Sequence, residues 1–297
     1  MKKLCLLLGV VGMSLSAIFV RLASAPSRVL VFYRVALSAL LLLPLVLLRH
    51  RAELSGLTGR DIGLCILSGA FLGLHFTLYF ESLRDTSVAA AVALVDTEVF
   101  FVALAMLLLF RERIPRGGWL GIGATFAGSL LIAMADAGGG SDLLRGDLLA
   151  LGGAAAMAVY TMIGKVCRKR ISTTVYTLFV YAAAAVTVLV LLLAGGTPVF
   201  GYAPRNLWAA AGLAVFCTLL GHSVFSWGLK FESASFIATI KLLEPVFSSV
   251  FAFFLFGEVP AWLTVLGGGI VILGVYLYAR FGEARDAQRE RTVEADE

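Results

Sequence analysis

The sequence predicts an all-α integral membrane protein whose ten transmembrane helices form two inverted repeats of five. Of the 297 residues, 60% are hydrophobic and only 14% are charged, and the mean hydropathy is +0.95. A soluble domain carries roughly 25% charged residues and lacks serial apolar runs of about 20 residues, the length that crosses a bilayer. Because the apolar runs follow one another with short connections, the chain holds one membrane domain and no sizeable soluble domain.

Ten apolar runs have the length of a membrane-spanning helix. In chain order, these spans are expected at Leu4–Leu22, Val29–Leu48, Ile62–Ser82, Ser87–Phe110, Trp119–Ala135, Asp147–Val166, Thr174–Ala194, Leu207–Leu229, Ser235–Gly257 and Trp262–Ala279. The first run lacks a clear A-x-A cleavage site and leads into further spans, so it is interpreted as a helix rather than a signal peptide. The expected organisation is a first five-helix repeat (1–135), a Gly-rich connection (136–146), a second, inverted five-helix repeat (147–279) and a charged cytoplasmic tail (280–297).

Basic residues predict the orientation in the membrane, because cytoplasmic loops are enriched in Lys and Arg. Of the 24 Lys and Arg residues, seventeen fall on one side of the predicted spans and five on the other, while Arg34 and Lys241 lie within spans. The chain is therefore expected in the cytoplasmic membrane, with both termini in the cytoplasm. Basic residues confined to loops and termini, with a net charge of only +5, argue against a nucleic-acid partner. The expected partners are the lipid bilayer and a small-molecule substrate.

The two halves of the chain match when one is shifted by 146 residues. The matched pairs are Leu83 with Leu229, Arg84 with Lys230, Glu98 with Glu244, Phe110 with Phe256, Glu112 with Glu258, and Gly121, Gly123 and Gly128 with Gly267, Gly269 and Gly274. Each half contains five spans, an odd number, so the second half enters the membrane in the opposite orientation. This design is typical of secondary transporters, whose substrate site lies near mid-membrane between the repeats. The alternative is chance similarity between Gly- and Leu-rich helices, which the matched charged positions disfavour.

Five segments carry a resemblance that covers essentially the whole chain. They are FYRVALSALLLL, LYFESLRDTSVAAAVAL, LFRERIPRGGWLGIGATFAGSLLI, WGLKFESASFIATIKLLEPVFSSVFAFFLFGE and LGGGIVILGVYLY. They resemble the drug/metabolite transporter superfamily, and within it the EamA-type exporters. The resemblance implies inverted repeats around a central cavity, alternating access, and export of small metabolites, with amino acids a prominent substrate class. The family often has Pro in span four where this chain has Val99, which predicts a first-half helix less broken than the second.

Lys241, Glu244 and Pro245 interrupt the apolar run of span nine and form the first candidate site. Charged residues in hydrocarbon are costly, and inside a span they indicate function. Lys241 and Glu244 are i,i+3 neighbours, so they can share a helix face and partly neutralise each other. Pro245 lacks an N–H, which leaves the Lys241 carbonyl without its usual donor. An amino-acid zwitterion offers groups complementary to this segment. The alternative is an ion pair that pins two spans together.

Span four contains two further carboxylates, Asp96 and Glu98. Residues two apart point to different sides of a helix, so they cannot both face one cavity squarely. Glu98, which matches Glu244 in the repeat, is the better candidate for the cavity. Asp96 is expected to pair with Arg34 of span two, because an unpaired arginine inside a span costs several kcal/mol.

Aromatic and histidine side chains are the remaining candidates for the cavity wall. They are His75 and Tyr79 in span three, Tyr160 in span six, His222 and Trp227 in span eight, and Phe247 in span nine. His75 and Tyr79 are i,i+4 neighbours and share a helix face. Polar-tipped aromatic residues suit aromatic or amphipathic solutes. The alternative for each is ordinary packing or a position at the membrane interface.

Glycines on spans five and ten indicate close helix packing. They are Gly121 and Gly128 in span five and Gly267 and Gly274 in span ten. Small residues at such spacing let two helices approach closely. Contact between these two spans is favoured and contact between two chains is the alternative, so the sequence leaves monomer and homodimer undecided.

The sequence carries no motif that predicts an enzyme. It lacks G-x-S-x-G, H-E-x-x-H and a phosphate loop, and its four isolated cysteines have no spacing typical of a metal site. We therefore expect neither enzymatic activity nor a cofactor or metal. The predicted function is export of small metabolites, above all amino acids, with aromatic or amphipathic ones favoured. The alternatives on the same fold are a lipid flippase or scramblase and multidrug efflux.

Overall fold

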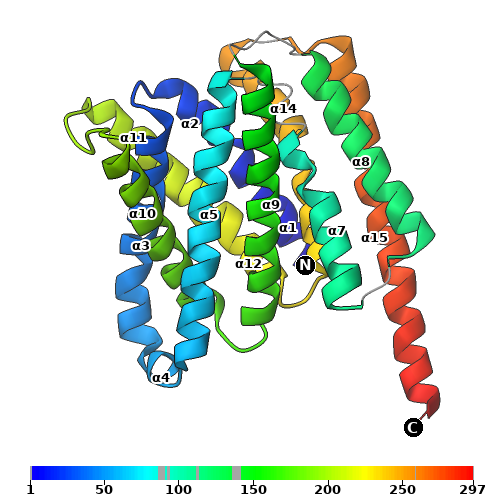
Figure 1. Ribbon diagram of the computed structural model, residues 1–297. Coiled ribbons are helices and arrows are strands. Elements are labelled where there is room, and N and C mark those ends of the chain that lie inside the picture. Colours follow the sequence, from blue (N-terminus) through cyan, green and yellow to red (C-terminus); the bar gives the residue numbers. More distant parts are fainter. Residues whose placement is uncertain are drawn as a thin grey trace.

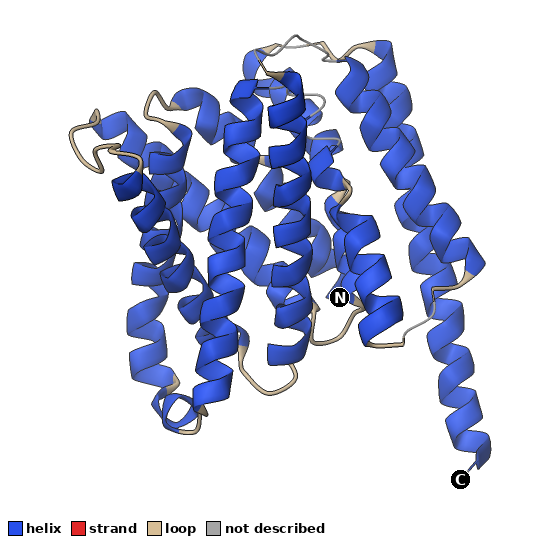
Figure 2. Ribbon diagram, viewed as in Figure 1, coloured by secondary structure: helices blue, strands red, loops and turns tan. Residues whose placement is uncertain are grey.

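The computed structural model describes residues 2–85, 91, 94–111, 114–135, 142–257 and 259–296. Over these residues the chain is helical, with short connections and no strand (Figures 1 and 2). Within the same part of the chain, eight helical runs are long and apolar enough to cross a membrane. The fold is therefore that of an all-α membrane protein, as the sequence predicts.

The helices follow the order expected from the sequence. The first half contains α1 (Lys2–Ser14), α2 (Ser16–Leu22), α3 (Ser27–Arg49), α4 (Arg51–Ser55), α5 (Gly59–Asp85), α7 (Glu98–Leu109) and α8 (Arg116–Ala135). The second half contains α9 (Leu143–Cys167), α10 (Thr173–Ala194), α11 (Pro204–Gly212), the π-helix η1 (Leu213–His222), α12 (Ser223–Gly228), α13 (Ala234–Lys241), α14 (Glu244–Phe256) and α15 (Trp262–Asp296).

Eight of the ten expected spans correspond to the eight long apolar runs of the described residues. The other two correspond to α8 and to α7 with the segment before it. Part of that segment, 86–90, 92 and 93, lies outside the described residues, as does 136–141 of the Gly-rich connection. The helix of the last span, α15, continues through the expected tail to Asp296.

Equivalent helices of the two halves run in opposite directions. α8 and α15 lie side by side (Figure 1). Gly121 of α8 meets Gly274 of α15, whereas Gly128, later in α8, meets Gly267, earlier in α15. The residue number of the contact rises along α8 while it falls along α15, so the two helices are antiparallel. Because α8 and α15 occupy matching positions in the repeat, the two halves are inverted relative to one another.

Backbone lies directly against backbone where α8 packs on α15. A Cβ atom added to Gly128 would lie 2.6 Å from the carbonyl oxygen of Gly267, and one added to Gly267 would lie 2.6 Å from that of Gly128. A Cβ atom at Gly121 would lie 2.8 Å from the carbonyl oxygen of Gly274. Real Cβ atoms do not approach backbone so closely, so this packing requires residues without a side chain.

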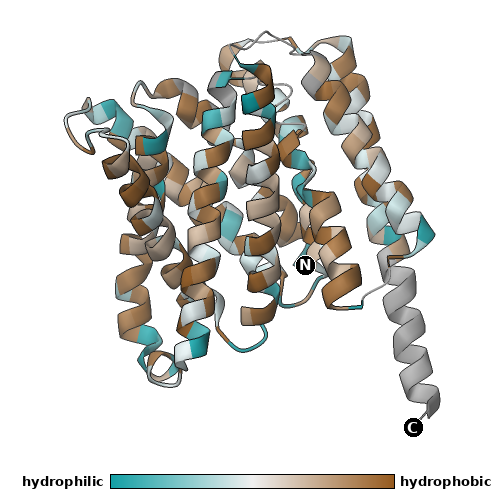
Figure 3. Ribbon diagram, viewed as in Figure 1, coloured by the Kyte–Doolittle hydropathy of each residue, from teal (hydrophilic) through white to brown (hydrophobic). Residues whose placement is uncertain are grey.

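Apolar side chains cover the outside of the helices, whereas several charged side chains lie inside. Hydrophobic residues predominate along the helices (Figure 3). Large ones such as Leu48, Leu108 and Phe254 are exposed, while Arg34 and Lys241 are buried. The outside of a membrane protein meets hydrocarbon rather than water, so this distribution fits a chain that spans the bilayer.

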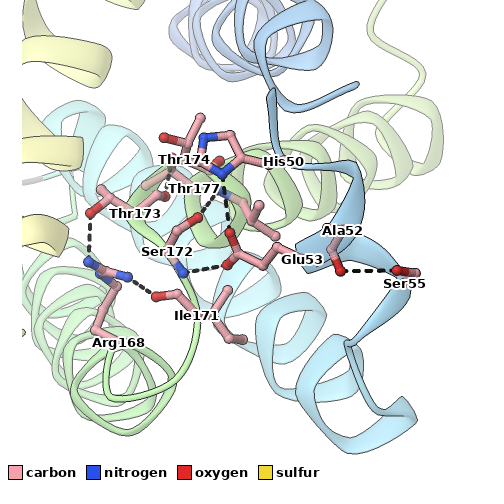
Figure 4. Close-up of polar contacts among 11 residues, drawn as sticks. His50, Ala52, Glu53, Ser55, Arg168, Ile171, Ser172, Thr173, Thr174 and Thr177 are labelled. Atoms are coloured by element: carbon pink, nitrogen blue, oxygen red, sulfur yellow. Dashed lines mark hydrogen bonds and ion pairs between the residues drawn. The ribbon is translucent and has the colours of Figure 1, made fainter. Parts of the chain in front are cut away.

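The short helix α4, which the sequence did not predict, ties the two halves together at one end of the helices (Figure 4). Glu53 of α4 accepts a hydrogen bond from the backbone N–H of Ser172 (2.5 Å), and its second oxygen lies 3.2 Å from Nδ1 of His50. Ser172 is the N-cap of α10 and accepts from the N–H of Val175. The Glu53 carboxylate thus lies at the positive end of the α10 dipole.

Arg168 stabilises the same α9–α10 connection from its other side (Figure 4). Its side chain is buried and donates from Nη2 to Oγ1 of Thr173 (2.6 Å) and from Nη1 to the carbonyl of Ile171. Its Nε donates to the carbonyl of Ser226 in α12 (2.9 Å). One arginine therefore holds the connection against the eighth span.

Replacing Glu53 by Ala is expected to lower the melting temperature of the detergent-solubilised protein. The variant removes the acceptor of the Ser172 N–H and the charge at the start of α10, a loss of about 1–2 kcal/mol. The melting temperature is read from the monodisperse peak in fluorescence-detected size-exclusion chromatography after heating. Glu53→Gln is the matched control, because its amide oxygen can still accept, and we expect a smaller decrease. Equal melting temperatures for wild type and both variants would contradict the contact.

Candidate functional site

Two broken spans place a glutamate at the same structural position in each half. The ninth span breaks after Lys241, and α14 begins at Glu244. The fourth span has a turn at Thr97, and α7 begins at Glu98. Each glutamate is thus the first residue of a helix, where the partial positive charge of the helix N-terminus favours a carboxylate. Discontinuous helices of this kind form the binding sites of inverted-repeat transporters.

The break in the fourth span is shorter than the break in the ninth, in line with the expectation from Val99 in place of proline. Thr97 is the one turn residue before α7 begins at Glu98, whereas Leu242 and Leu243 separate α13 from α14. The Leu94 carbonyl accepts from both the N–H (3.2 Å) and the Oγ1 (2.5 Å) of Thr97. A threonine that bonds back to the preceding turn competes with the regular ladder, so the helix breaks without proline.

Lys241 pairs with Glu98 of the other half rather than with Glu244 of its own span. Its Nζ lies 2.5 Å from Oε1 of Glu98, and each residue is only 8% exposed. The expected i,i+3 pairing fails because α13 ends at Lys241, and a turn through Leu242 and Leu243 separates it from α14. The ion pair joins the two repeats. Glu244 still interacts electrostatically with Lys241 and Arg34.

Arg34 does not pair with Asp96 as the sequence suggested. Its Nε donates to Oγ1 of Thr218 in η1 (2.8 Å), and its guanidinium lies 4.4 Å from the centre of the Phe76 ring. Asp96 lies beside Ser129 of α8. Among the described residues, its buried Oδ2 has no hydrogen-bond partner. The two side chains are apart because Arg34 faces the eighth span, whereas Asp96 lies beside the fifth.

Histidine and aromatic side chains from α5 and η1 meet between the repeats. Nδ1 of His75 lies 3.0 Å from the Gly153 carbonyl, which can only accept, so this nitrogen carries the proton. The His75 ring stacks on Tyr79, with the ring centres 6.3 Å apart. Phe76 meets His222 edge-on at 5.4 Å. His75 and His222 both interact electrostatically with Arg34 and Lys241, so they belong to the same buried cluster.

The other three wall candidates lie in different surroundings. Tyr160 is buried, its hydroxyl bonds to Oγ of Ser226 (2.9 Å), and it interacts electrostatically with Glu98, so it belongs to the cluster. Phe247 packs beside the apolar core that α13, α7 and α1 share. Trp227 packs against Phe231, which Lys2 covers, at the N-terminal end of α1. Trp227 therefore packs outside the buried cluster that contains Arg34 and Lys241.

The family of the chain follows from its two halves. The model of the EamA-like transporter family matches residues 2–134 and again 144–280. The chain belongs to the EamA-like transporter family. The two matched segments correspond to the two halves that the shift of 146 residues relates in the sequence.

Named relatives of this EamA-like transporter are also transporters. An uncharacterized transporter of Archaeoglobus fulgidus is 30% identical, over 84% of this chain and 86% of the relative. The pseudopaline exporter CntI of Pseudomonas aeruginosa is 25% identical, over 87% of this chain and 88% of the relative. One crystal structure shares the fold with a TM-score of 0.81 at 18% identity, covering 95% of this chain and 98% of that chain.

The sequence did not reveal the π-helix of this EamA-like transporter or the residues that hold it. η1 contains ten residues, Leu213–His222, and Oγ1 of Thr218 donates to the Leu213 carbonyl. Tyr181 of α10 donates to the Thr218 carbonyl (3.2 Å), and Arg34 donates to the Thr218 hydroxyl. An apolar run gives the same hydropathy whether it forms an α- or a π-helix, so no sequence signal marked Thr218. π-helical turns occur often at functional sites.

Proposed function

We propose that this EamA-like transporter exports small zwitterionic metabolites, above all amino acids, across the cytoplasmic membrane by alternating access. The observation that carries the proposal is the buried ion pair between Lys241 and Glu98, which joins two broken helices from opposite repeats. Because Lys241 and Glu98 belong to opposite repeats, forming or breaking their ion pair changes how the two repeats are held relative to one another. A solute that competes for these charges can therefore alter how the repeats pack.

The charges around the pair favour a zwitterion over a purely anionic or purely cationic solute. Arg34 supplies a second buried cation, held by Thr218 and Phe76, and it interacts electrostatically with Glu244. A solute that carries both an ammonium and a carboxylate brings no net charge into the membrane interior, where unpaired charge is costly. His75 and Tyr79 add polar-tipped rings that suit aromatic or amphipathic side chains.

Export, rather than uptake, is supported by the relative from Pseudomonas aeruginosa, which is named for exporting pseudopaline. The excess of basic residues on one side of the spans supports a location of both termini in the cytoplasm. Accessibility of single cysteines placed in α4 to a membrane-impermeant thiol reagent in intact cells tests this orientation. Labelling without lysis would contradict it.

Counterflow in proteoliposomes tests the proposed function. Vesicles containing the purified protein are loaded with an unlabelled amino acid and diluted into the same labelled amino acid, with phenylalanine, leucine and threonine tested in turn. We expect transient accumulation of label that protein-free vesicles do not show. Absence of counterflow for a broad metabolite panel, together with movement of fluorescent lipid between leaflets, would overturn the proposal in favour of a flippase or scramblase.

A further inference from the structure

Two contacts between the repeats follow an exchange rule. In each of them, two residues from opposite repeats interact, and so do the two residues that lie 146 positions away from them in the other repeat. Gly121 contacts Gly274 in the α8–α15 packing. Their equivalents in the other repeat are Gly267 and Gly128, which also contact each other. The second pair of equivalent contacts lies at the centre of the protein. There, the Ser14 hydroxyl donates to the Glu244 carbonyl (3.1 Å), and the equivalent residues, Tyr160 and Glu98, interact as well.

Applied to the ion pair, the exchange rule exposes an asymmetry between the two glutamates. The residues equivalent to Lys241 and Glu98 in the other repeat are Val95 and Glu244. Glu98 therefore faces a lysine, whereas Glu244 has valine at the equivalent position. Asp96, next to Val95 in the chain, interacts electrostatically with Glu244, which supports the placement of this segment beside that glutamate.

The side chains around the two glutamates differ in size as well as in charge. Tyr160 stands near Glu98, whereas the equivalent residue near Glu244 is Ser14. Glu98 is buried, and Glu244 is only partly buried. In the part of the chain that the structure describes, the Glu244 carboxylate has no ion pair or hydrogen bond. Lys241 and Tyr79 interact electrostatically with Glu244 as well, but among the described residues the direct contact of the Lys241 ammonium group is made to Glu98 alone.

We propose that the ammonium group of the substrate binds to Glu244 in the position that Lys241 occupies at Glu98. This assignment rests on the proposed function and specifies its substrate class as solutes with a primary ammonium group. Glu244 is the first residue of α14, as Glu98 is of α7, so both carboxylates have the same helix N-terminus behind them. Arg34, which interacts with Glu244, is positioned to receive the carboxylate of the same zwitterion.

A lysine placed on the other repeat tests the assignment. Val95→Lys is expected to pair with Glu244, occupy the ammonium position and reduce amino-acid counterflow about 100-fold. Val95→Met adds similar length without charge, and its counterflow should exceed that of Val95→Lys by about tenfold or more. The double variant Val95→Lys/Lys241→Val moves the lysine from one repeat to the other and leaves Glu98 without a lysine. It is expected to recover part of the counterflow that Val95→Lys loses.

Two further measurements keep the assignment falsifiable if Val95→Lys does not fold. Glu244→Gln, which leaves the Lys241–Glu98 pair intact, should reduce counterflow about 100-fold. In wild type, the deaminated analogue of the best amino acid in the panel (3-phenylpropanoate for phenylalanine) should fail to compete. Competition by that analogue, or wild-type counterflow in folded Val95→Lys, overturns the ammonium site while the proposed function stands. No counterflow in wild type overturns both.

Discussion

Lys241→Met is expected to abolish counterflow and to destabilise the protein while leaving its insertion into the membrane intact. Methionine has similar length but no charge, so Glu98 keeps a buried carboxylate without its partner, which is 2.5 Å away in wild type. Removing one member of a buried pair costs about 3–5 kcal/mol, because the remaining charge stays desolvated. The melting temperature in detergent and counterflow in proteoliposomes measure the two effects separately.

A double variant separates the cost of the unpaired charge from the loss of packing. Lys241→Met/Glu98→Gln removes both charges, so its melting temperature should lie above that of Lys241→Met. Counterflow should still be absent, because the link between the repeats is lost. A Lys241→Met protein that transports at the wild-type rate would contradict a role for the pair in transport. Equal melting temperatures of single and double variants would contradict the pairing itself.

Gly128→Ala is expected to destabilise the protein although it adds a single carbon atom. That atom would lie 2.6 Å from the Gly267 carbonyl oxygen and 2.8 Å from the Val271 side chain. α8 and α15 must then separate, and overpacking of this kind costs about 1–3 kcal/mol. The melting temperature in detergent should fall accordingly.

Gly123→Ala provides a matched control on the same helix. A Cβ atom at Gly123 meets no atom within 4 Å, so the substitution changes helix propensity without touching the contact. Alanine is favoured over glycine inside a helix by about 1 kcal/mol, so the melting temperature should stay constant or rise. If Gly128→Ala and Gly123→Ala behave alike, the close approach of α8 and α15 does not determine stability.

The membrane fold and the relation between its halves could be read from the sequence because they depend on local composition and on spacing. Apolar runs of spanning length define helices wherever they occur. The shift that aligns Gly121 with Gly267 also aligns Glu98 with Glu244, and the structure places both glutamates at the first residue of a helix. Residues at equivalent positions of the two halves can therefore be paired from the sequence without knowing which helices are in contact.

The pairing of charges could not be predicted, because it depends on contacts between distant segments. Helix spacing predicts that Lys241 pairs with Glu244, but the turn after Lys241 removes that spacing, and Lys241 pairs with Glu98 from the other half. Arg34 was matched with Asp96 by charge alone, whereas an uncharged hydroxyl and an aromatic ring surround it. Neither Thr218 nor Phe76 carries a sequence feature that would select it as the partner of an arginine.

Lys241 has no counterpart in the other repeat, where Val95 stands, and under the proposed alternating access this makes the two end states unequal. In an inverted-repeat carrier, exchanging the conformations of the two repeats converts the state open to one side into the state open to the other. Identical repeats would give both states equal energy. Here the exchange replaces Lys241 and Glu98 by Val95 and Glu244, so it does not map the protein onto itself. Under the proposed alternating access, the two states therefore differ in energy, and each difference of about 1.4 kcal/mol changes their ratio tenfold. The unequal charges then give the unloaded protein a preferred side of the membrane to face.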